Sequence, residues 1–287
     1  MSKQTLPIVL GSVILLVVMS QSAPASDLTN RLRLGGSLGM AMSEQEDLNE
    51  TIDHYENVYS GWHSDWDDSE LRSAFEVGAY AEYLLNENWI VGAEFLRSSS
   101  SGGYDWYDGW SSGPVGTTDV DADYDATGNL VSAYGVYRLP LGDSAAALRL
   151  GAGVGYLFGA QFEMDFDAYQ EGQPFSGNPD STVVYQMDLK ATGSALALHG
   201  LVGAEYEVTG SLLLSANLAY RVAHVDELEV DDFTRIVNGC PDDLWHIEEG
   251  KPLRWDSGIS SLSTVEGDKV GLDFSGFHLT LSVAYTF

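Results

Sequence analysis

The feature of this sequence that most constrains its fold is a strict alternation of long and short connections between segments of period-two hydrophobicity. Apolar residues recur at every second position in eight segments: 31–42, 71–86, 89–98, 130–141, 145–162, 191–208, 212–225 and 270–287. Such a pattern is typical of β-strands with two different faces. Connections one, three, five and seven are long, and the others are the short sequences "NEN" (86–88), "GDS" (142–144) and "TGS" (209–211). This order predicts an all-β, up-and-down antiparallel meander of eight strands.

The four long connections, at 43–70, 99–129, 163–190 and 226–269, hold most of the acidic residues. They contain 34 of the 43 aspartates and glutamates, and the net charge of the chain is −30. All four lie at one end of the meander, whereas a soluble sandwich carries comparable loops at both ends. A basic nucleic-acid footprint is absent, so we expect no nucleic-acid partner.

The aromatic residues indicate which face of the strands points outward. One set lies beside the short turns and a second set lies toward the long connections: Tyr83, Trp89, Tyr137, Tyr206 and Tyr285, then Phe75, Phe95, Tyr156, Tyr220 and Phe277. Eight residues of a tilted strand span about 20 Å of height, close to the apolar band of a membrane barrel between its two aromatic girdles. A soluble core would give no reason for two rings. We therefore predict a transmembrane β-barrel with its apolar face toward lipid.

The opposite face of the strands is charged or small, and in such a barrel it lines the lumen. The predicted lumen charge network consists of Arg33, Arg72, Glu76, Glu82, Glu94, Arg138, Arg149, Glu205 and Arg221. An eight-stranded barrel is just wide enough for side chains to fill it. The near-balance of charge signs predicts a plugged lumen, with glycines such as Gly151, Gly153 and Gly155 making room inside.

The two ends of the chain fit an exported barrel. Residues 1–25 have the layout of a signal peptide, with Lys3, an apolar run from Ile8 to Met19 and the small-residue sequence "SAPAS". Residues 26–287 then form one barrel domain. The last strand ends the chain without a turn, so we predict that it pairs with the first strand and leaves no open edge.

These features together resemble the small Gram-negative outer-membrane β-barrel proteins of the OmpA/OmpX type. The resemblance implies an eight-stranded barrel in the cell outer membrane, with four long extracellular loops and three short periplasmic turns. It also implies that the alternating carboxyl-terminal residues are the signal read by the barrel-assembly machinery: Leu281, Val283, Tyr285 and Phe287. Outer-membrane lipid and lipopolysaccharide would surround the protein, which we expect to be a monomer.

One acidic motif raises the question of a bound metal. "DVDADYDATGN" places Asp119, Asp121, Asp123 and Asp125 at alternate positions, like the start of an EF-hand loop. The glycine and the final glutamate of such a loop are missing, so any Ca²⁺ or Mg²⁺ site would be weak. The same pattern equally suits the solvated edge of a strand that rises above the membrane. We predict no cofactor.

Enzyme chemistry has one weak candidate. "HSDWDDSE" (63–70) and "HVD" (224–226) distantly resemble the aspartate and histidine motifs of the omptin proteases. Omptins have ten strands, and the order and loops of these motifs differ. We therefore predict a non-enzymatic protein whose acidic, aromatic-rich loops serve envelope integrity or surface interaction. A narrow cation-preferring channel and an omptin-like protease are the alternatives.

Overall fold

The computed structural model describes residues 31–42, 71, 73–108, 118–142, 144–171, 182–237, 240–241, 247–256, 261–263 and 268–287. All regular elements among these residues are β-strands. No helix in the described ranges is long and apolar enough to cross a membrane. The predicted signal peptide, residues 1–25, lies outside the described residues.

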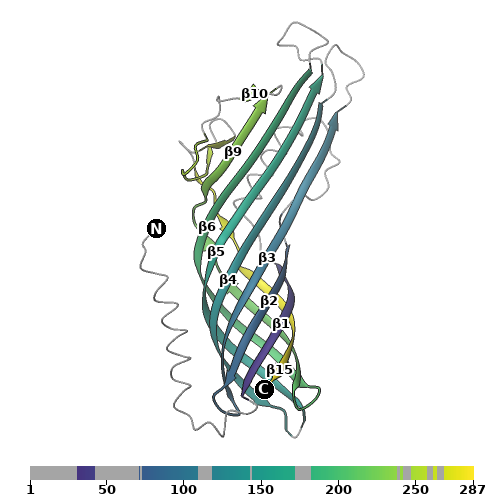
Figure 1. Ribbon diagram of the computed structural model, residues 1–287, viewed down its shortest axis with the longest axis vertical. Helices are drawn as coiled ribbons and strands as arrows, with labels where there is room; N and C mark the ends of the chain where they lie inside the picture. Colours follow the sequence, from purple (N-terminus) through teal and green to yellow (C-terminus); the bar gives the residue numbers. More distant parts are fainter. Residues whose placement is uncertain are drawn as a thin grey trace.

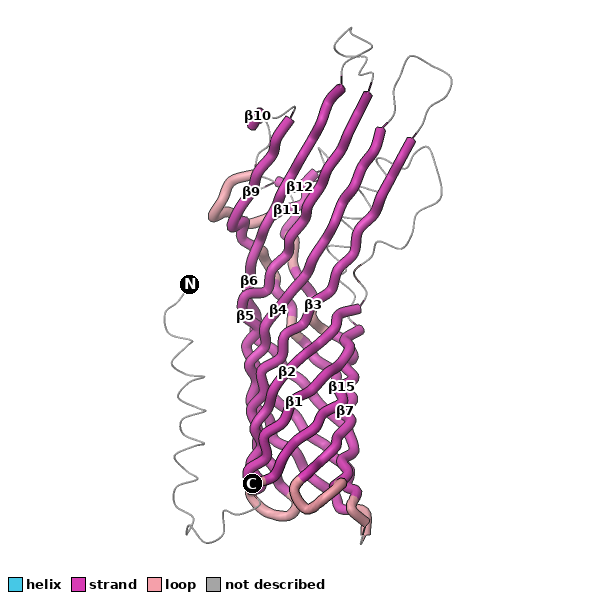
Figure 2. Tube along the Cα trace, turned by 45° about the vertical axis from the view of Figure 1, so that its right-hand side comes forward, coloured by secondary structure: helices cyan, strands magenta, loops and turns pink. Residues whose placement is uncertain are grey.

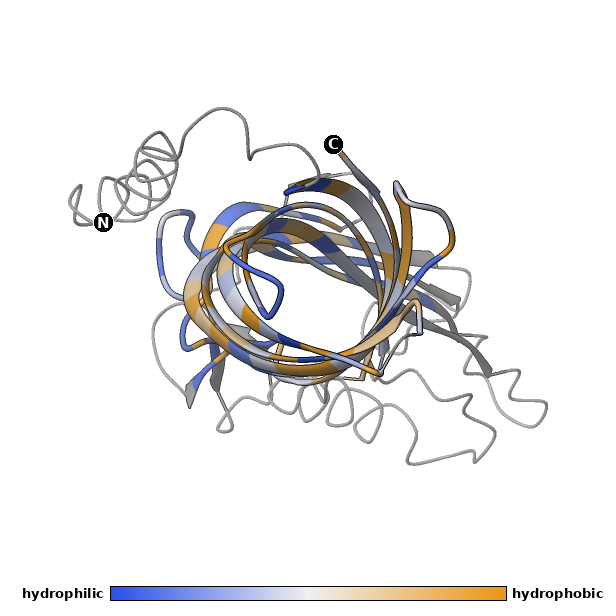
Figure 3. Cartoon of the chain, turned by 90° about the horizontal axis from the view of Figure 1, so that it is seen from below, coloured by the Kyte–Doolittle hydropathy of each residue, from blue (hydrophilic) through white to orange (hydrophobic). Residues whose placement is uncertain are grey.

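Eight strands form a closed antiparallel ring, as the sequence predicts (Figures 1 and 3). They are β1 (Leu32–Met42), β2 (Ser73–Leu84), β3 (Trp89–Asp108), β4 (Thr118–Pro140), β5 (Ala146–Glu171), β6 (Thr182–Glu207), β7 (Leu212–Val222) and β15 (Gly276–Thr286). Each strand from β1 to β7 pairs with the next one along the chain. Strand β15 then pairs with β7 and with β1 and completes the ring. The fold is an up-and-down barrel.

The last strand closes this ring. On one side β15 pairs with β1 from Arg33↔Thr286 to Met42↔Phe277, and on the other it pairs with β7. The prediction that the carboxyl-terminal strand meets the first strand is confirmed. Every strand of the barrel wall therefore has two neighbours, which removes the unpaired edge groups that lipid could not satisfy.

The three short connections are turns held by side-chain acceptors. Asn86 Oδ1 accepts hydrogen bonds from the backbone N–H groups of Asn88 and Trp89, each at 2.9 Å. Thr209 Oγ1 accepts from the N–H of Leu212 at 3.1 Å. In the turn between β4 and β5, Ser144 Oγ accepts from the N–H of Ala146 at 3.3 Å, and Gly142 has a φ of +64°, a conformation that favours glycine. Local polar residues thus fix the turns that join β2 to β3, β4 to β5 and β6 to β7.

Strands β3 to β6 extend far beyond the other four, and here the predicted strand bounds are too short. They have 20, 23, 26 and 26 residues, against 11 or 12 in β1, β2, β7 and β15. Much of the predicted loops 99–129 and 163–190 is therefore strand. Figures 1 and 2 show these strands rising above the ring as a tall curved sheet. At this height β9 (Glu229–Val237) replaces β7 beside β6 and is followed by β10 (Cys240–Pro241).

The predicted loop 226–269 contributes to a segment that covers the inner face of the tall sheet. We call residues 223–230, 247–256 and 268–275 the strap. It contains β8 (His224–Val225), the start of β9, β11 (Arg254–Asp256), β13 (Asp268–Lys269) and β14 (Leu272–Asp273), with β12 (Ser261–Ser263) paired to β11. Backbone hydrogen bonds join Leu228 to Val270 and Leu253 to Leu228, at 3.1 and 2.7 Å. The strap is therefore an ordered layer that packs on the sheet.

A bulge in β5 reverses which residues point inward. Below it, odd-numbered residues such as Arg149 and Leu157 are buried in the barrel, whereas above it Ala160, Phe162 and Met164 are buried. The pairing of β5 with β6 shifts between Leu157 and Ala160, and Gly159 has a φ of +54°. One extra residue changes the phase of a strand. Apolar residues continue at even positions through Ala160 and Phe162, so the sequence pattern alone does not reveal the change of face.

Candidate functional site

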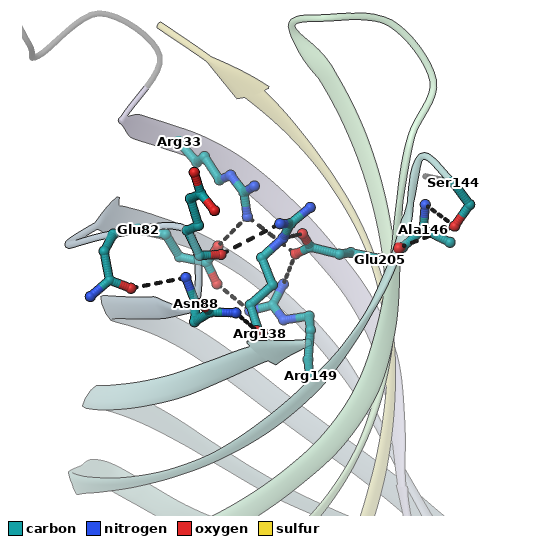
Figure 4. Close-up of polar contacts among 10 residues, drawn as sticks. Arg33, Glu82, Asn88, Arg138, Ser144, Ala146, Arg149 and Glu205 are labelled. Carbon is teal, nitrogen blue, oxygen red and sulfur yellow. Dashed lines mark hydrogen bonds and ion pairs between the residues drawn. The ribbon is translucent and has the colours of Figure 1, made fainter. Parts of the chain in front are cut away.

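Five charged side chains cross the lumen near the short-turn end, and we call them the lower charge layer (Figure 4). They are Arg33, Glu82, Arg138, Arg149 and Glu205, from five different strands. The side chains of Glu82 and Glu205 are fully buried. Because a buried carboxylate is costly unless it is paired, the contacts of these two residues determine whether the layer is stable.

Each of the two carboxylates in this layer contacts more than one arginine. Glu205 Oε2 accepts from Arg33 Nη1 at 3.1 Å, and its Oε1 pairs closely with Arg138 Nε. Glu82 Oε1 pairs with Arg149 Nη2 and accepts from the Tyr134 hydroxyl at 3.1 Å. Arg149 Nη1 also lies 3.8 Å from Glu205 Oε2. The layer is one connected network, so removal of one member affects all the others.

A second group of polar side chains lies farther up the lumen, centred on Glu76. Its Oε1 accepts from Ser98 Oγ at 2.7 Å and from Arg221 Nη1 at 2.9 Å. His278 Nδ1 lies 3.1 Å from the same oxygen, an ion-pair distance without hydrogen-bond alignment. Ser132 Oγ donates to Glu94 Oε1 at 2.8 Å, and His199 Nε2 lies 3.9 Å from that oxygen. In the described residues, Glu94 has no arginine at ion-pair distance, unlike the other three lumen glutamates.

Glycines opposite the large polar side chains let these side chains lie flat against the barrel wall. Tyr80 faces Gly35, Tyr134 faces Gly92, His199 faces Gly153 and Asn217 faces Gly203 in the strand register. A Cβ on any of these glycines would come within 2.4 to 2.5 Å of the facing side chain. These positions require glycine because a larger residue would displace its partner.

Above the polar groups the lumen becomes apolar. Leu96, Leu130 and Leu157 are at most 4% exposed and belong to the same core as the strap residues Val225, Leu228, Leu253, Val270, Leu272 and Phe274. A Cβ on Gly128 would lie 2.9 Å from the ring of Phe274. The strap therefore packs directly on the wall of the upper lumen and fills it with apolar side chains.

The structure places eight of the nine residues of the sequence-predicted charge network in the lumen. Arg72 lies outside the described residues. Sequence reasoning missed the hydroxyl groups that complete the network, which belong to Tyr80, Ser98, Ser132 and Tyr134. Their positions share the phase of the inward charges, so the signal was present, but the predicted network was limited to charged residues. The residues predicted to form the assembly signal, Leu281, Val283, Tyr285 and Phe287, are each 50% exposed or more. They lie on the outer face of β15, with Phe287 following the strand.

The outer surface of the tall sheet is acidic. Asp121, Asp123, Asp125, Glu163, Asp165, Asp167 and Asp188 point outward from β4, β5 and β6, and we call this surface the acidic sheet face. Asp123, Asp165 and Asp188 lie directly opposite one another on adjacent strands. Burial, with a hydrogen bond and charge from Asp188 and the nearby Glu163 and Asp123 carboxylates, raises the pKa of Asp165 above its ordinary 3.8. Lys190 Nζ is the exception in this charge pattern and contacts Glu163 Oε1 at 3.0 Å.

The motif considered as a calcium loop is part of this sheet. Residues Asp121, Asp123 and Asp125 follow one face of β4, which confirms that the motif is part of a strand. The side chain of Asp119 lies outside the description. Side chains two residues apart on a strand are separated by about 6.6 Å and do not converge. Among the described residues, no three His, Cys, Asp or Glu side chains are grouped to hold a metal ion.

The protease motifs are only partly within the described residues. Asp65 lies outside them. His224 Nε2 is 3.7 Å from Asp226 Oδ1, and its Nδ1 is 4.0 Å from Asp273 Oδ1. Both distances exceed hydrogen-bond length. A general acid or base must come within hydrogen-bond reach of the group with which it exchanges a proton.

Comparison with known proteins gives one family match over most of the chain. The model described as "Outer membrane protein beta-barrel domain" matches residues 11–238. No curated protein matches the sequence significantly. Among solved structures, Neisserial surface protein A is 14% identical with a TM-score of 0.37, covering 89% of this chain and 97% of its own. OprG from Pseudomonas aeruginosa is also 14% identical, with a TM-score of 0.37 and coverages of 90% and 96%. Ail of Yersinia pestis is 14% identical with a TM-score of 0.32, covering 90% and 99%.

Proposed function

Because the chain belongs to the outer membrane protein β-barrel domain family, we propose that it is a non-enzymatic surface protein that uses its acidic sheet face for contacts outside the outer membrane. On this proposal the signal peptide at 1–25 directs export, and the apolar belt anchors the barrel in the lipid. The tall sheet then stands on the extracellular side.

The observation that carries this proposal is the change of the outer surface with height, from apolar to uncharged polar to acidic. The exposed large apolar residues of the described chain all lie on the barrel strands and short turns, up to Met42, Phe75, Phe158, Val222 and Phe277. Above this belt the outward residues of β4, β5 and β6 are first uncharged, as at Thr127, Gln161 and Thr192. Farther up they become mostly acidic, with Lys190 as the exception. Like charges directly opposite each other on neighbouring strands weaken a sheet. Their presence on this sheet supports a role in interaction rather than in stability.

We propose that the partner chemistry is divalent cations that bridge the carboxylates to the phosphates of lipopolysaccharide. The acidic sheet face lies above the apolar belt, on the side where this proposal places the headgroups of the outer leaflet. Carboxylate oxygens are suitable ligands for Mg²⁺ and Ca²⁺, especially when other ligands come from a second molecule. The cations would therefore be shared between protein and lipid rather than held by the protein alone.

Binding of purified lipopolysaccharide to the detergent-solubilised protein tests this proposal. In the test variant Asp123→Asn, Asp165→Asn and Asp188→Asn are combined, and the control combines Glu87→Gln and Glu207→Gln at the opposite end of the barrel. We expect Mg²⁺-dependent binding by the wild type and the control, lost in the test variant or after chelation. Equal binding by all three proteins would contradict the proposal, provided that each shows the heat-modifiable gel shift of a folded barrel.

A narrow cation channel is less compatible with the packing of the lumen. The lower charge layer crosses it, and Leu130, Leu157 and Phe274 fill its upper part. Reconstitution in a planar bilayer tests this alternative, and steady cation-selective conductance by the intact protein would support the channel. The protease alternative is tested separately with Asp65→Asn and His224→Ala, which should abolish any peptide cleavage if those groups are catalytic.

A further inference from the structure

The contact between His278 and Glu76 passes over a strand that lies between them. Glu76 is on β2 and His278 is on β15, and both of these strands pair with β1. In the register, Gly39 of β1 stands opposite Glu76 and Ala41 stands opposite His278. Because these two residues are small, the larger side chains meet over them, with His278 Nδ1 3.1 Å from Glu76 Oε1. The contact therefore links the two neighbours of the first strand, at the seam where β15 closes the ring.

Both partners in this contact are shielded from solvent. The side chain of His278 is 1% exposed, and that of Glu76 is fully buried. Arg221 Nη1 also contacts Glu76 Oε1, at 2.9 Å. A buried carboxylate is stable only when cations and hydrogen-bond donors surround it, so the charge state of His278 matters for this part of the lumen.

The polar residues around this contact do not balance in charge if both histidines are neutral. We call Glu76, Glu94, Arg221, His199 and His278 the upper charge group. Its two carboxylates share one arginine, which leaves a net charge of −1. Among the described residues, no arginine of the lower charge layer lies at ion-pair distance from either carboxylate. One proton bound to an imidazole would make the upper charge group neutral.

His278 is better placed than His199 to hold that proton. Its Nδ1 lies 3.1 Å from Glu76, whereas His199 Nε2 lies 3.9 Å from Glu94 Oε1. The side chain of Glu94 is 23% exposed, so its charge keeps some contact with solvent that the charge of Glu76 lacks. A cavity of about 50 Å³ lies beside both imidazole rings. It gives the ring of His278 room to turn until its N–H points at the carboxylate.

We propose that His278 is a proton-binding site. A proton from the solvent turns its imidazole into a cation that pairs with Glu76 and holds β15 and β2 together across β1. Because this ion pair exists only in the folded barrel, its contribution to stability is present in acid and is lost as the imidazole gives up its proton at higher pH. Histidine is the side chain that ordinarily changes charge between about pH 5 and 8. The site is independent of the acidic sheet face, which lies on the outside of the molecule.

Charged and titratable groups face the same cavity from six other strands. They are Tyr80 and Glu82 on β2, Glu94 on β3, Tyr134 on β4, Arg149 on β5, His199 on β6 and Arg221 on β7, while β1 contributes the uncharged Ser37. Glu82 already pairs with Arg149 and accepts from the hydroxyl of Tyr134. Among the groups that face the cavity, His199 is the one whose ordinary titration overlaps that of His278, so each test includes a His199 variant.

Nitrogen NMR of the full mature protein in detergent micelles, with labelled histidine, tests the protonation directly. Both ring nitrogens of a charged imidazole carry hydrogen, whereas only one does in the neutral ring, so the two forms have different spectra. We expect His278 to keep its proton to a higher pH in the wild type than in Glu76→Gln. His199→Gln is the control, which assigns the signals and should leave the titration of His278 unchanged. The proposal is overturned if His278 is neutral at about pH 5.5, or if it titrates alike with and without the Glu76 carboxylate.

Urea unfolding at two pH values tests the link across the seam without changing Glu76. His278→Gln keeps a polar side chain at this position but cannot become a cation. We expect the wild type and His199→Gln to need more urea for unfolding at about pH 5.5 than at about pH 8.5, and His278→Gln to lose most of this difference. The heat-modifiable gel shift measures the folded fraction at each urea concentration. A His278→Gln barrel with the same pH dependence as the wild type would contradict the proposal.

Discussion

The apolar belt of the barrel and the tall sheet above it share strands β3 to β6, but their polar and apolar residues are arranged in opposite ways. Strand β4 passes through both without a break in its inward phase. In the belt its inward residues include Arg138 and Ser132, and in the tall sheet they are Tyr124 and Ala122. The outward residues change in the reverse direction, from Tyr137 at the base to Asp123 above the belt.

This comparison shows that strand periodicity and the direction of hydrophobic burial are separate properties. Alternation specifies a strand with two faces at every height. Which face is apolar depends on what surrounds the strand, since lipid excludes charge from the outside of the belt and water favours it on the tall sheet. The strap then supplies the covering layer that the inner apolar face needs in water.

The largest effect is expected from breaking the charge network inside the belt. Glu205→Gln leaves Arg33, Arg138 and Arg149 without their shared carboxylate, and loss of one member of a buried pair costs about 3–5 kcal/mol. Urea unfolding from detergent micelles, followed by the gel shift, measures the loss. Glu207→Gln, two residues later and exposed at the turn, is the control and should stay within about 0.5 kcal/mol of the wild type. Similar stabilities for the two variants would mean that the lower charge layer contributes little.

A comparable effect is expected in the core of the tall sheet. Phe162 is 2% exposed and stacks on Tyr124 with ring centroids 6.4 Å apart. Phe162→Ala should cost about 3–5 kcal/mol because it opens a cavity beneath the strap. Hydrogen exchange of β4, β5 and β9 measures this locally. Phe158→Ala, four residues earlier and facing outward from the belt, should cost less because lipid chains can fill the space.

Arginine placed on the outer face of β5 should distinguish the two environments. Val154 is 53% exposed and lies in the middle of the belt, so Val154→Arg should destabilise the barrel by about 2–4 kcal/mol. Asp167→Arg, on the outer face of the same strand above the belt, should be neutral or slightly stabilising because it reduces the local repulsion. Refolding into lipid vesicles measures both variants. Equal losses would place position 167 inside the lipid.

The smallest expected effect concerns the pH dependence of the acidic sheet face. The pKa of Asp165 is raised in the folded protein, so the protonated form is favoured by folding. The resulting contribution to the stability of the folded protein is fully present when the pH is below the ordinary pKa of 3.8. It is lost as the pH rises through the higher pKa of Asp165 in the folded protein. Asp165→Asn should therefore remove this pH-dependent loss of stability and make the tall sheet slightly more stable at neutral pH.

Hydrogen exchange of the β5 and β6 amides against pH measures this change. Glu163→Gln provides the contrasting control, because it removes the contact with Lys190 and should weaken the same strands slightly. A pH profile of Asp165→Asn identical to that of the wild type would show that the facing carboxylates do not interact energetically.

The fold could be predicted to a large extent because its main signals are local. Turn residues such as Asn86 and Thr209, the period-two pattern and the alternating connection lengths all act over a few residues. They were sufficient for the number of strands, the closure by β15 and the inward phase of Arg33, Glu82 and Glu205. The change of face after Phe158 could not be predicted, because the bulge changes the phase of the strand while apolar residues continue at even positions.

The candidate site was less predictable because it depends on contacts between distant parts of the chain. The pairing of His199 with Gly153, and the packing of Phe274 on Gly128, follow from register and from the path of the strap. Acidic residues within a strand also looked like loop composition, so the height of β3 to β6 was underestimated. Only the neighbouring strands and the strap make those segments favourable as a sheet.

The sequence by itself determined that this chain forms a closed β-barrel with a charged interior, because alternation and connection length are properties of each segment alone. The tertiary structure decided where the barrel ends and the tall sheet begins, which charges meet in the lumen and where polar groups stay without partners. Those features depend on register, bulges and packing across the barrel, and they arise only when all the strands are assembled.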